Sequence, residues 1–132
     1  MTAPIVLHLM RHGEPALAGR LLGSTDCEVL PDGVRACRSA AAGLAIRQVV
    51  ASNLRRSAGC AVAVATDHEV PLRLDGRWRE LDFGHWDGRS PDEVDATALR
   101  GFWDDPDGAP PPGGERWSTL LQRVAQALEE VE

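Results

Sequence analysis

The sequence predicts an α/β domain with a mostly parallel, open sheet and helices on both of its faces. Three segments of strand-like composition, residues 5–10, 48–52 and 72–74, alternate with two segments of helical composition, residues 32–46 and 54–65. This alternation is typical of a parallel sheet, because each helix carries the chain back along a face of the sheet to the start of the next strand. With 132 residues the chain can hold one such domain, which would span the whole sequence.

The N-terminal part of the chain predicts a buried strand that runs into a long loop. Residues 5–10 are apolar except for His8, which fits a central strand buried on both faces, with His8 as a core residue. Residues 14–33 are rich in glycine, proline, serine and aspartate and predict a loop. Loops of this length inside compact domains are often functional.

The predicted helices in the middle of the chain follow from periodicity and capping signals. The segment 32–46 carries an apolar stripe at helical spacing, and 54–65 is rich in alanine and valine. Ser90 stands immediately before a proline and three residues before Glu93, which is the sequence signature of a capped helix start. A helix is therefore predicted over 90–99.

The C-terminal part predicts a loop followed by a strongly amphipathic helix. Residues 106–114 contain too many prolines and glycines for a helix and predict an exposed loop. From Trp117 onward, apolar residues recur at helical spacing. Because the apolar face of a crossover helix implies a strand to follow, we expect the sequence to continue beyond Glu132.

Composition and charge narrow the functional class. The formal net charge of −6 argues against a general nucleic-acid binder, which needs a basic surface to neutralise phosphates. The sequence contains no apolar run long enough for a membrane span and does not begin like a signal peptide, so we expect a cytoplasmic protein. All 14 basic residues are arginine, and the absence of lysine excludes a P-loop. The three widely spaced cysteines predict reduced packing residues and neither disulfides nor a zinc site.

The residues that follow the predicted first strand carry the strongest chemical signal. Ligands of open α/β sheets bind beyond the carboxyl ends of the strands, and Arg11, His12 and Gly13 stand there. A neutral imidazole is a good nucleophile towards phosphorus, a guanidinium can hold two phosphoryl oxygens, and a glycine lets backbone N–H groups approach an anion closely. The tripeptide alone also fits an ordinary polar corner between a strand and a loop.

Five motifs in order along the chain resemble those of the histidine phosphatase (phosphoglycerate mutase-like) superfamily. They are LHLMRHGEP, GRLLGSTDCEVLPDGVRA, ASNLRRSAGCA, WRELDFGHWDG and PPPGGERWSTLLQRV. The third is the most altered, since it departs from the family pattern at Asn53 and three other positions, although its arginine, Arg56, is kept. In the fourth, Asp87 stands where the family has glutamate. Together the motifs cover nearly the whole chain.

The resemblance implies a phosphomonoester hydrolase and a role for each matched residue. His12 would attack phosphorus in line and become a phosphohistidine. Arg11 and Arg56 would hold the phosphoryl oxygens, with Gly13 allowing close approach. Glu80 would protonate the leaving alkoxide. Because cationic side chains stabilise the charge in this scheme, neither a metal nor another cofactor is expected.

One element of the family pattern has no counterpart in the chain. The family places a second histidine after a later strand, where it completes the phosphate pocket, and none of the four histidines stands in that position. We therefore expect the chain as given to be weakly active or inactive. This leaves open a function of another class, a catalytically silent module that binds a phosphorylated ligand.

The loops indicate a substrate within the family. Mutases of the family carry a tyrosine and a lysine where this chain has FGHWDG, and the chain contains neither residue, which favours a phosphatase over a mutase. The loops most resemble those of the α-ribazole phosphate phosphatases of cobalamin synthesis, with Arg20, Ser24 and Trp86 as candidate substrate-loop residues. A broad-specificity phosphatase is the near alternative. The expected partner is a small-molecule phosphate ester, and a homodimer is left open.

A metal site is the competing interpretation of the fourth motif. Glu80, Asp82, His85 and Asp87 could form a divalent-metal cluster, but their crowding in one turn-rich segment is not a recognised ligand spacing. Trp86 could line an aromatic ligand pocket, although tryptophans more often pack in the core.

Overall fold

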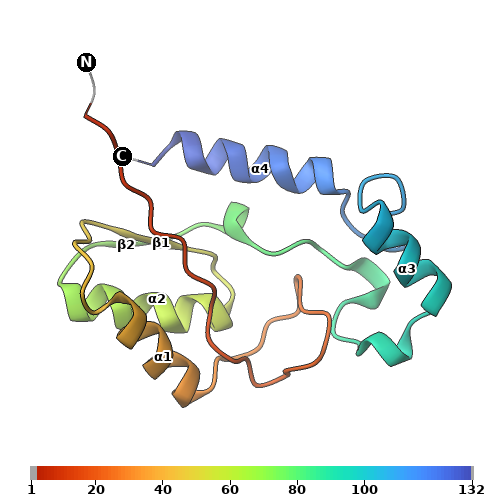
Figure 1. The fold of residues 1–132 in the computed structure, drawn as a ribbon, viewed down its shortest axis with the longest axis horizontal. Helices are drawn as coiled ribbons and strands as arrows, with labels where there is room; N and C mark the ends of the chain where they lie inside the picture. Colours follow the sequence, from red (N-terminus) through yellow and green to blue (C-terminus); the bar gives the residue numbers. More distant parts are fainter. Residues whose placement is uncertain (1–2, 132) are drawn as a thin grey trace.

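The computed structural model describes residues 3–131. Its regular elements, in chain order, are α1 (Pro31–Ala41), β1 (Val49–Ala51), α2 (Arg55–His68), β2 (Leu72–Leu74), the 3-10 turns η1 (Gly76–Trp78), η2 (Gly84–Trp86) and η3 (Pro91–Glu93), α3 (Ala96–Asp104) and α4 (Trp117–Glu129). Figure 1 shows their arrangement in the order of the sequence. No helix among residues 3–131 combines the length and the apolar character that crossing a membrane requires.

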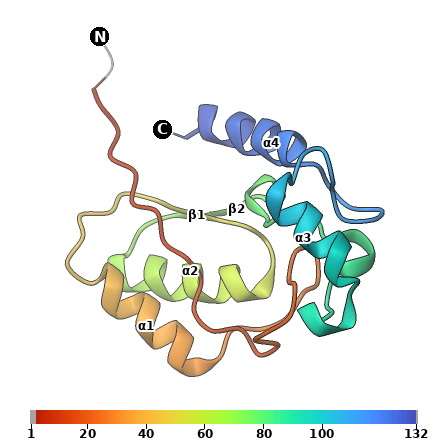
Figure 2. The ribbon, with the colours of Figure 1, turned by 45° about the vertical axis from the view of Figure 1, so that its right-hand side comes forward.

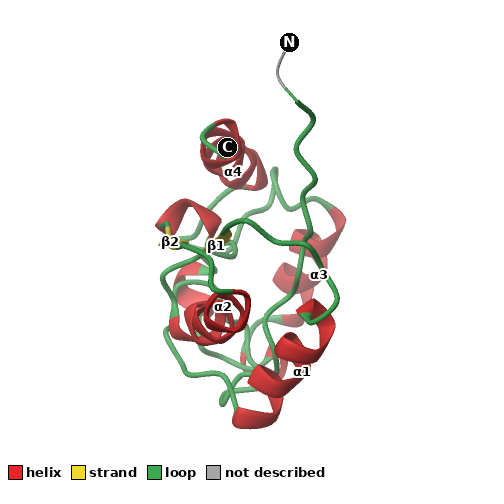
Figure 3. Cartoon of the chain, turned by 90° about the vertical axis from the view of Figure 1, so that its left-hand side faces the viewer, coloured by secondary structure: helices red, strands yellow, loops and turns green. Residues whose placement is uncertain are grey.

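The sheet consists, in the described part of the chain, of the two strands β1 and β2. They pair in parallel, with Val49 opposite Leu72 and Ala51 opposite Leu74. Helix α2 connects them and packs against both strands, and α1 packs on α2. Helix α4 lies on the opposite side of the sheet from α2 (Figures 1 and 3). The predicted fold class, α/β with a parallel sheet and helices on both faces, is therefore confirmed.

Two clusters of buried side chains hold these layers together. One lies between α1 and α2 and consists of Cys37, Ala41, Cys60 and Val64. The other joins the loop at Leu21 and the η2 turn to α3 and α4. Its centre is Phe102, which is 3% exposed and meets Phe83 and Trp86 edge-on. Figure 2 shows α1 and α2 at one end of the molecule and α3 at the other.

Residues 5–10 do not form the predicted buried strand. They run extended from the N-terminal end (Figure 1), but no described strand pairs with them, and Val6 and Leu9 are 75% and 88% exposed. His8 is exposed as well and is not a core residue. The prediction is wrong because an apolar run is buried on both faces only where other elements flank it. Instead, this segment and β1 line a cavity of about 670 Å³.

The ends of the first two helices differ from the prediction for local reasons. Helix α1 ends at Ala41 rather than at residue 46, shortly before Gly43, and the Ala41 carbonyl contacts the Nε2 atom of His68 at 2.9 Å. Helix α2 continues beyond residue 65 to His68 and stops where Glu69 adopts a left-handed φ of 53°. A left-handed residue is a common helix terminator because it turns the chain away from the helix axis.

The predicted capping box is present but starts a turn instead of a helix. Ser90 and Glu93 cap each other's backbone N–H groups at the η3 turn. Val94 is then extended, which breaks the helical path. Helix α3 begins after Asp95, whose carboxylate accepts a hydrogen bond of 2.8 Å from the N–H of Ala98. The sequence signal therefore identified a helix start one turn too early.

Candidate active site

The residues predicted to act on phosphate line one cavity of about 880 Å³. Its wall is formed by residues 10–15, which follow the extended N-terminal segment, by residues around the start of α2, and by the segment between η1 and η2. The structure thus brings together five of the predicted site residues: Arg11, His12, Gly13, Arg56 and Glu80. Since they come from three motifs far apart in the sequence, their convergence depends on the fold.

The cavity is cationic within an acidic chain. Its lining contains four arginines, namely Arg11, Arg20, Arg56 and Arg79, and two carboxylates, Glu14 and Glu80. The chain as a whole carries a formal net charge of −6. A concave site in which positive charges outnumber negative ones attracts anions and holds their charge. The cavity is therefore suited to a small anionic ligand.

The ring of His12 is held in one orientation by its neighbour's backbone. Its Nδ1 atom lies 2.7 Å from the carbonyl oxygen of Gly13, and the side chain is half-buried in the cavity wall. A carbonyl oxygen can only accept, so Nδ1 donates and carries the proton of the neutral ring. The lone pair of the neutral imidazole then lies on Nε2. That atom is the one available to attack an electrophile.

The loop that carries His12 is anchored on its C-terminal side. Residues 14–16 pair antiparallel with 28–30 through two backbone hydrogen bonds of 2.8 Å. This pairing fixes the chain just after the nucleophile and immediately before α1. The position of His12 therefore depends on the long loop closing back on itself.

Gly13 is required by a backbone contact. A Cβ atom at this position would lie 2.4 Å from the backbone of Gly33, so any larger residue would force the two segments apart. Its N–H points to the Sγ atom of Cys60 at 3.4 Å. The close approach predicted for Gly13 is thus to the backbone of Gly33 and not to a ligand, and the Gly13 N–H donates to the Cys60 sulfur.

Two buried thiols lie behind this loop. Cys60 accepts from Gly13, and the Sγ atom of Cys37 lies 3.8 Å from the carbonyl oxygen of Arg11. Burial, together with the neighbouring Cys60, raises the pKa of the Cys37 thiol to about 11. Cys37 is therefore a neutral packing group near pH 7. Both cysteines are buried and free of disulfides, in keeping with the prediction of reduced packing residues.

Arg56 lies in the cavity wall and is also hydrogen-bonded to the long loop. It is 2% exposed, and it donates to the carbonyl oxygens of Thr25 at 2.7 Å, Leu22 at 2.9 Å and Gly23 at 2.8 Å. A guanidinium has five N–H donors, so Nε–H and one Nη1–H are left for a ligand. The sequence anticipated the position of Arg56 but not its loop contacts, because their acceptors are backbone atoms.

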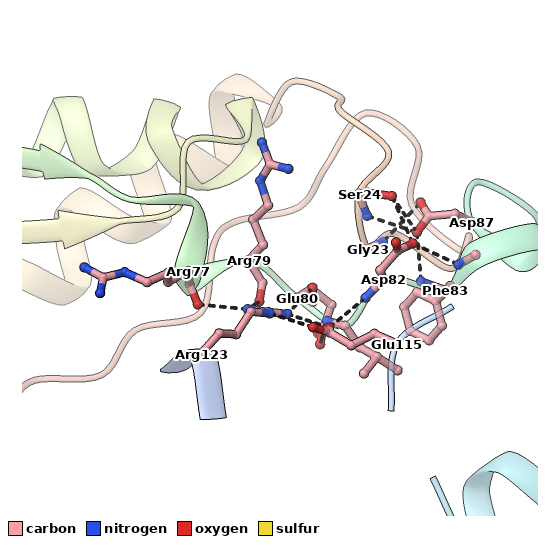
Figure 4. Close-up of polar contacts among 12 residues, drawn as sticks. Gly23, Ser24, Arg77, Arg79, Glu80, Asp82, Phe83, Asp87, Glu115 and Arg123 are labelled. Carbon is pink, nitrogen blue, oxygen red and sulfur yellow. Dashed lines mark hydrogen bonds and ion pairs between the residues drawn. The ribbon is translucent and has the colours of Figure 1, made fainter. Parts of the chain in front are cut away.

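Glu80 stands at the exposed rim of the cavity. Its Oε1 accepts a hydrogen bond of 2.8 Å from the N–H of Leu81, and the carboxylate remains open to solvent. Figure 4 shows Glu80 between Arg79 and Asp82, on a stretch without helix or strand. Polar contacts with Arg123 and Glu115 surround this stretch.

The three candidate substrate-loop residues are not brought together at the cavity. Only Arg20 lines it, and its Nη1 donates to the carbonyl of Gly88 at 2.9 Å. Trp86 is 6% exposed within the core around Phe102. Ser24 is exposed and donates through its hydroxyl to the carboxylate of Asp87 at 3.3 Å. Ser24 and Trp86 thus stabilise the structure beside the cavity, outside its described lining.

Asp87 organises the loop that Arg56 also holds. Its carboxylate accepts from the N–H groups of Ser24 at 2.9 Å and Phe83 at 3.1 Å (Figure 4). It also accepts from the N–H of Thr25 at 2.7 Å and from the Thr25 hydroxyl. Burial raises the pKa of this carboxyl, but the hydrogen bonds from Thr25, Ser24 and Phe83 outweigh burial and leave the pKa below its usual value. Because these donors occupy the carboxylate, Asp87 does not belong to a metal cluster with Glu80.

One polar residue of the cavity wall, Arg79, was not predicted from the sequence. Arg79 lines the cavity, and its Nε donates to the Oδ1 of Asn53 at 2.8 Å. Asn53 is one of the positions where the third motif departs from the family pattern. The adjacency of Arg79 to Glu80, together with this departure, was the available signal. The pair adds a guanidinium beside the predicted phosphate residues.

Comparison with known proteins decides the family. The sequence pattern of the histidine phosphatase superfamily (branch 1) matches residues 7–132. The chain belongs to this superfamily. It is 36% identical over 132 residues to a glucosyl-3-phosphoglycerate phosphatase from Mycolicibacterium vanbaalenii. The aligned region covers 95% of this chain and 59% of the relative. This histidine phosphatase family member therefore spans about three fifths of that relative's length.

Solved structures show the same fold. YhfR from Bacillus stearothermophilus superimposes with a TM-score of 0.81 at 27% identity, over 90% of this chain and 63% of that one. The α-ribazole phosphatase from Shigella flexneri gives a TM-score of 0.76 over 91% of this chain and 63% of that one. At 23% identity, the second likeness concerns the fold alone.

Proposed function

We propose that this family member is a phosphomonoester hydrolase that acts through a phosphohistidine at His12. The observation that carries the proposal is the hydrogen bond between His12 Nδ1 and the Gly13 carbonyl, which leaves Nε2 as the nucleophile inside a cationic cavity. The family membership supports the same chemistry. Its ligand is a small phosphate ester, and the proposal includes a cytoplasmic enzyme that forms a homodimer.

The reaction proceeds in two steps, phosphoryl transfer to His12 and hydrolysis of the phosphohistidine. Nε2 of His12 attacks phosphorus, a P–N bond forms, and the P–O bond to the leaving group breaks as Glu80 gives its proton to the departing oxygen. Water then attacks the phosphohistidine, the P–N bond breaks and phosphate leaves. The proton released by the water passes to solvent, from which Glu80 is protonated again. Arg11 and the free donors of Arg56 stabilise the phosphoryl oxygens in both steps.

Two substrate classes compete within this proposal. An α-ribazole 5'-phosphate, to which the loops point, carries no anionic group besides its phosphate. A phosphoglycerate-type ester carries a carboxylate as well. Arg79 favours the second class, because it adds a guanidinium to the cavity wall besides those of the predicted phosphate arginines. Asn53 holds this guanidinium in place. A guanidinium that does not bind the phosphate can bind the carboxylate of such an ester.

The test compares turnover of p-nitrophenyl phosphate, α-ribazole 5'-phosphate and glucosyl-3-phosphoglycerate. We expect His12→Ala to abolish phosphate release and the phosphohistidine signal in ³¹P NMR. His85→Ala serves as the control, because His85 is exposed and does not line the cavity. Arg79→Ala should lower turnover only for glucosyl-3-phosphoglycerate, which carries a carboxylate besides its phosphate. Turnover that persists without His12 would refute the mechanism.

The silent binding module is the second candidate function. His12 is the only histidine among the described residues that line the 880 Å³ cavity, which accords with the expected weak activity of the chain. Phosphate binding measured by calorimetry, with no turnover and no phosphohistidine after prolonged incubation with p-nitrophenyl phosphate, would support the module over the enzyme.

A further inference from the structure

The segment that carries Glu80 has no secondary structure of its own. Residues 79–83, between η1 and η2, form neither helix nor strand, and the Glu80 side chain is exposed. An acid that must donate a proton to a leaving oxygen has to be held within hydrogen-bond reach of that atom. Some contact from elsewhere must therefore hold this segment.

That contact comes from Arg123, in the middle of α4. Its Nη1 donates to the carbonyl oxygens of Arg77 at 2.8 Å and Arg79 at 2.7 Å, and its Nη2 donates to the carbonyl of Glu80 at 2.9 Å. Its Nε and Nη2 donate to the two carboxylate oxygens of Glu115, each at 2.8 Å. These bonds use all five N–H groups of a guanidinium.

Glu115 holds the backbone on the other side of Glu80 by hydrogen bonds. Its Oε1 accepts from the N–H of Asp82 at 3.3 Å, and its own N–H donates to the carbonyl of Asp82 at 2.9 Å. The backbone is thus held at residues 77, 79 and 80 by Arg123 and at residue 82 by Glu115 (Figure 4). The side chains of Arg123 and Glu115 are only 20% and 13% exposed, so water screens their attraction less than it would at the surface.

We propose that Arg123, together with Glu115, is a positioning residue that holds the Glu80 carboxyl at the phosphate cavity. The inference rests on the proposed function, in which Glu80 protonates the leaving group. Arg123 itself does not touch substrate, since its donors are all engaged by the protein. Its planar fork is essential to the arrangement, because a lysine ammonium has three donors and cannot match two carboxylate oxygens and three carbonyls at once.

The test varies the leaving group, since a displaced acid matters only where protonation is needed. The variants are Arg123→Lys and Glu115→Gln. The control is Arg38→Lys, which removes a more exposed bidentate pair, with Asp67, that does not line the cavity. Each is assayed with p-nitrophenyl phosphate, whose leaving phenolate is stable without a proton, and with glycerol phosphate, whose leaving alkoxide is not.

We expect Arg123→Lys to lower kcat for glycerol phosphate by about 10²-fold, the usual cost of misplacing a reacting group by about 1 Å, and to change turnover of p-nitrophenyl phosphate by less than about threefold. KM should change little for either substrate. Glu115→Gln should act in the same direction, and Arg38→Lys should change neither rate. Equal losses on both substrates would show a general structural role and would overturn the inference.

The crystal structures of Arg123→Lys and of the unaltered chain provide a second readout that does not depend on turnover. A Glu80 backbone displaced from the cavity wall in the variant supports the inference. An unmoved Glu80 overturns it, even in a protein that hydrolyses none of the substrates. A chain without turnover or phosphohistidine would contradict the proposed function alone.

Discussion

Replacing Asp87 gives the sharpest test of how the loop beside the cavity is held. The carboxylate accepts hydrogen bonds from several backbone N–H groups, and three of these, from Thr25 at 2.7 Å, Phe83 at 3.1 Å and Gly23 at 3.3 Å, are partly buried. The Ser24 N–H is exposed and can turn to water when the acceptor is removed. The Gly23 bond is longer than an ordinary N–H···O bond, so the two shorter bonds, from Thr25 and Phe83, dominate the cost of losing Asp87.

The magnitude follows from the strength of such bonds. A hydrogen bond to a charged group contributes about 1.5–3 kcal/mol, so Asp87→Ala should lower the free energy of unfolding by about 3–6 kcal/mol. Asp87→Asn keeps an acceptor oxygen but loses the charge, and neutral hydrogen bonds are about half as strong. We expect this variant to lose about 1.5–3 kcal/mol.

The assay is urea denaturation followed by tryptophan fluorescence, because Trp86 is buried next to this network. Ser24→Ala is the control, since it removes an exposed hydroxyl that donates to the same carboxylate at 3.3 Å. A loss for Asp87→Asn no greater than the loss for Ser24→Ala would refute the reasoning.

The same carboxylate predicts how stability depends on pH. The pKa of Asp87 is lower in the folded protein than in the unfolded chain, so the unfolded state binds the proton more readily. The contribution of Asp87 is therefore fully present above the unfolded pKa, near 3.8, and is lost as the pH falls through the lower folded pKa. Asp87→Asn should flatten the acid side of the stability curve relative to the unaltered chain.

Three further predictions concern packing. Gly13→Ala should prevent stable folding, because its Cβ would lie 2.4 Å from backbone, whereas Gly43→Ala, with open space around the site, should leave the urea midpoint nearly unchanged. Phe102→Ala should lower the free energy of unfolding by about 3–5 kcal/mol, and Trp103→Ala, at a side chain 64% exposed, should cost far less in the same denaturation assay. Cys37, whose burial raises its pKa to about 11, should react with iodoacetamide many times more slowly in the native protein than in urea at pH 8, as read by mass spectrometry; equal rates would show that the thiol is accessible.

Local sequence patterns predicted the elements whose formation depends on nearby residues. The strands at 48–52 and 72–74 and the helix from Trp117 are found within one or two residues of their predicted starts. The five motif residues at the cavity were also identified, because the family pattern records which positions converge even when they lie far apart in the sequence. Of the three candidate substrate residues, however, only Arg20 lines the cavity.

The features that the sequence could not predict depend on distant neighbours. The apolar character of 5–10 indicates a strand but does not show whether another strand lies beside it, and the segment is in fact exposed. The contacts of Arg56 and Arg123 end mainly on backbone carbonyls, which every residue possesses, so no residue type marks the acceptor. Trp86 lies close to Glu80 in sequence, yet the η2 turn directs it into the core.

The anchoring of the His12 loop has a practical consequence for handling the protein. The contacts that fix this loop lie after the nucleophile, in the pairing of 14–16 with 28–30 and the fit of Gly13 against Gly33, and directly before it, where Cys37 contacts the carbonyl of Arg11. The extended residues before it belong to no described strand ladder. An affinity tag, fluorophore or surface tether attached ahead of residue 5 should therefore leave the imidazole in place, which makes this end suited to immobilisation.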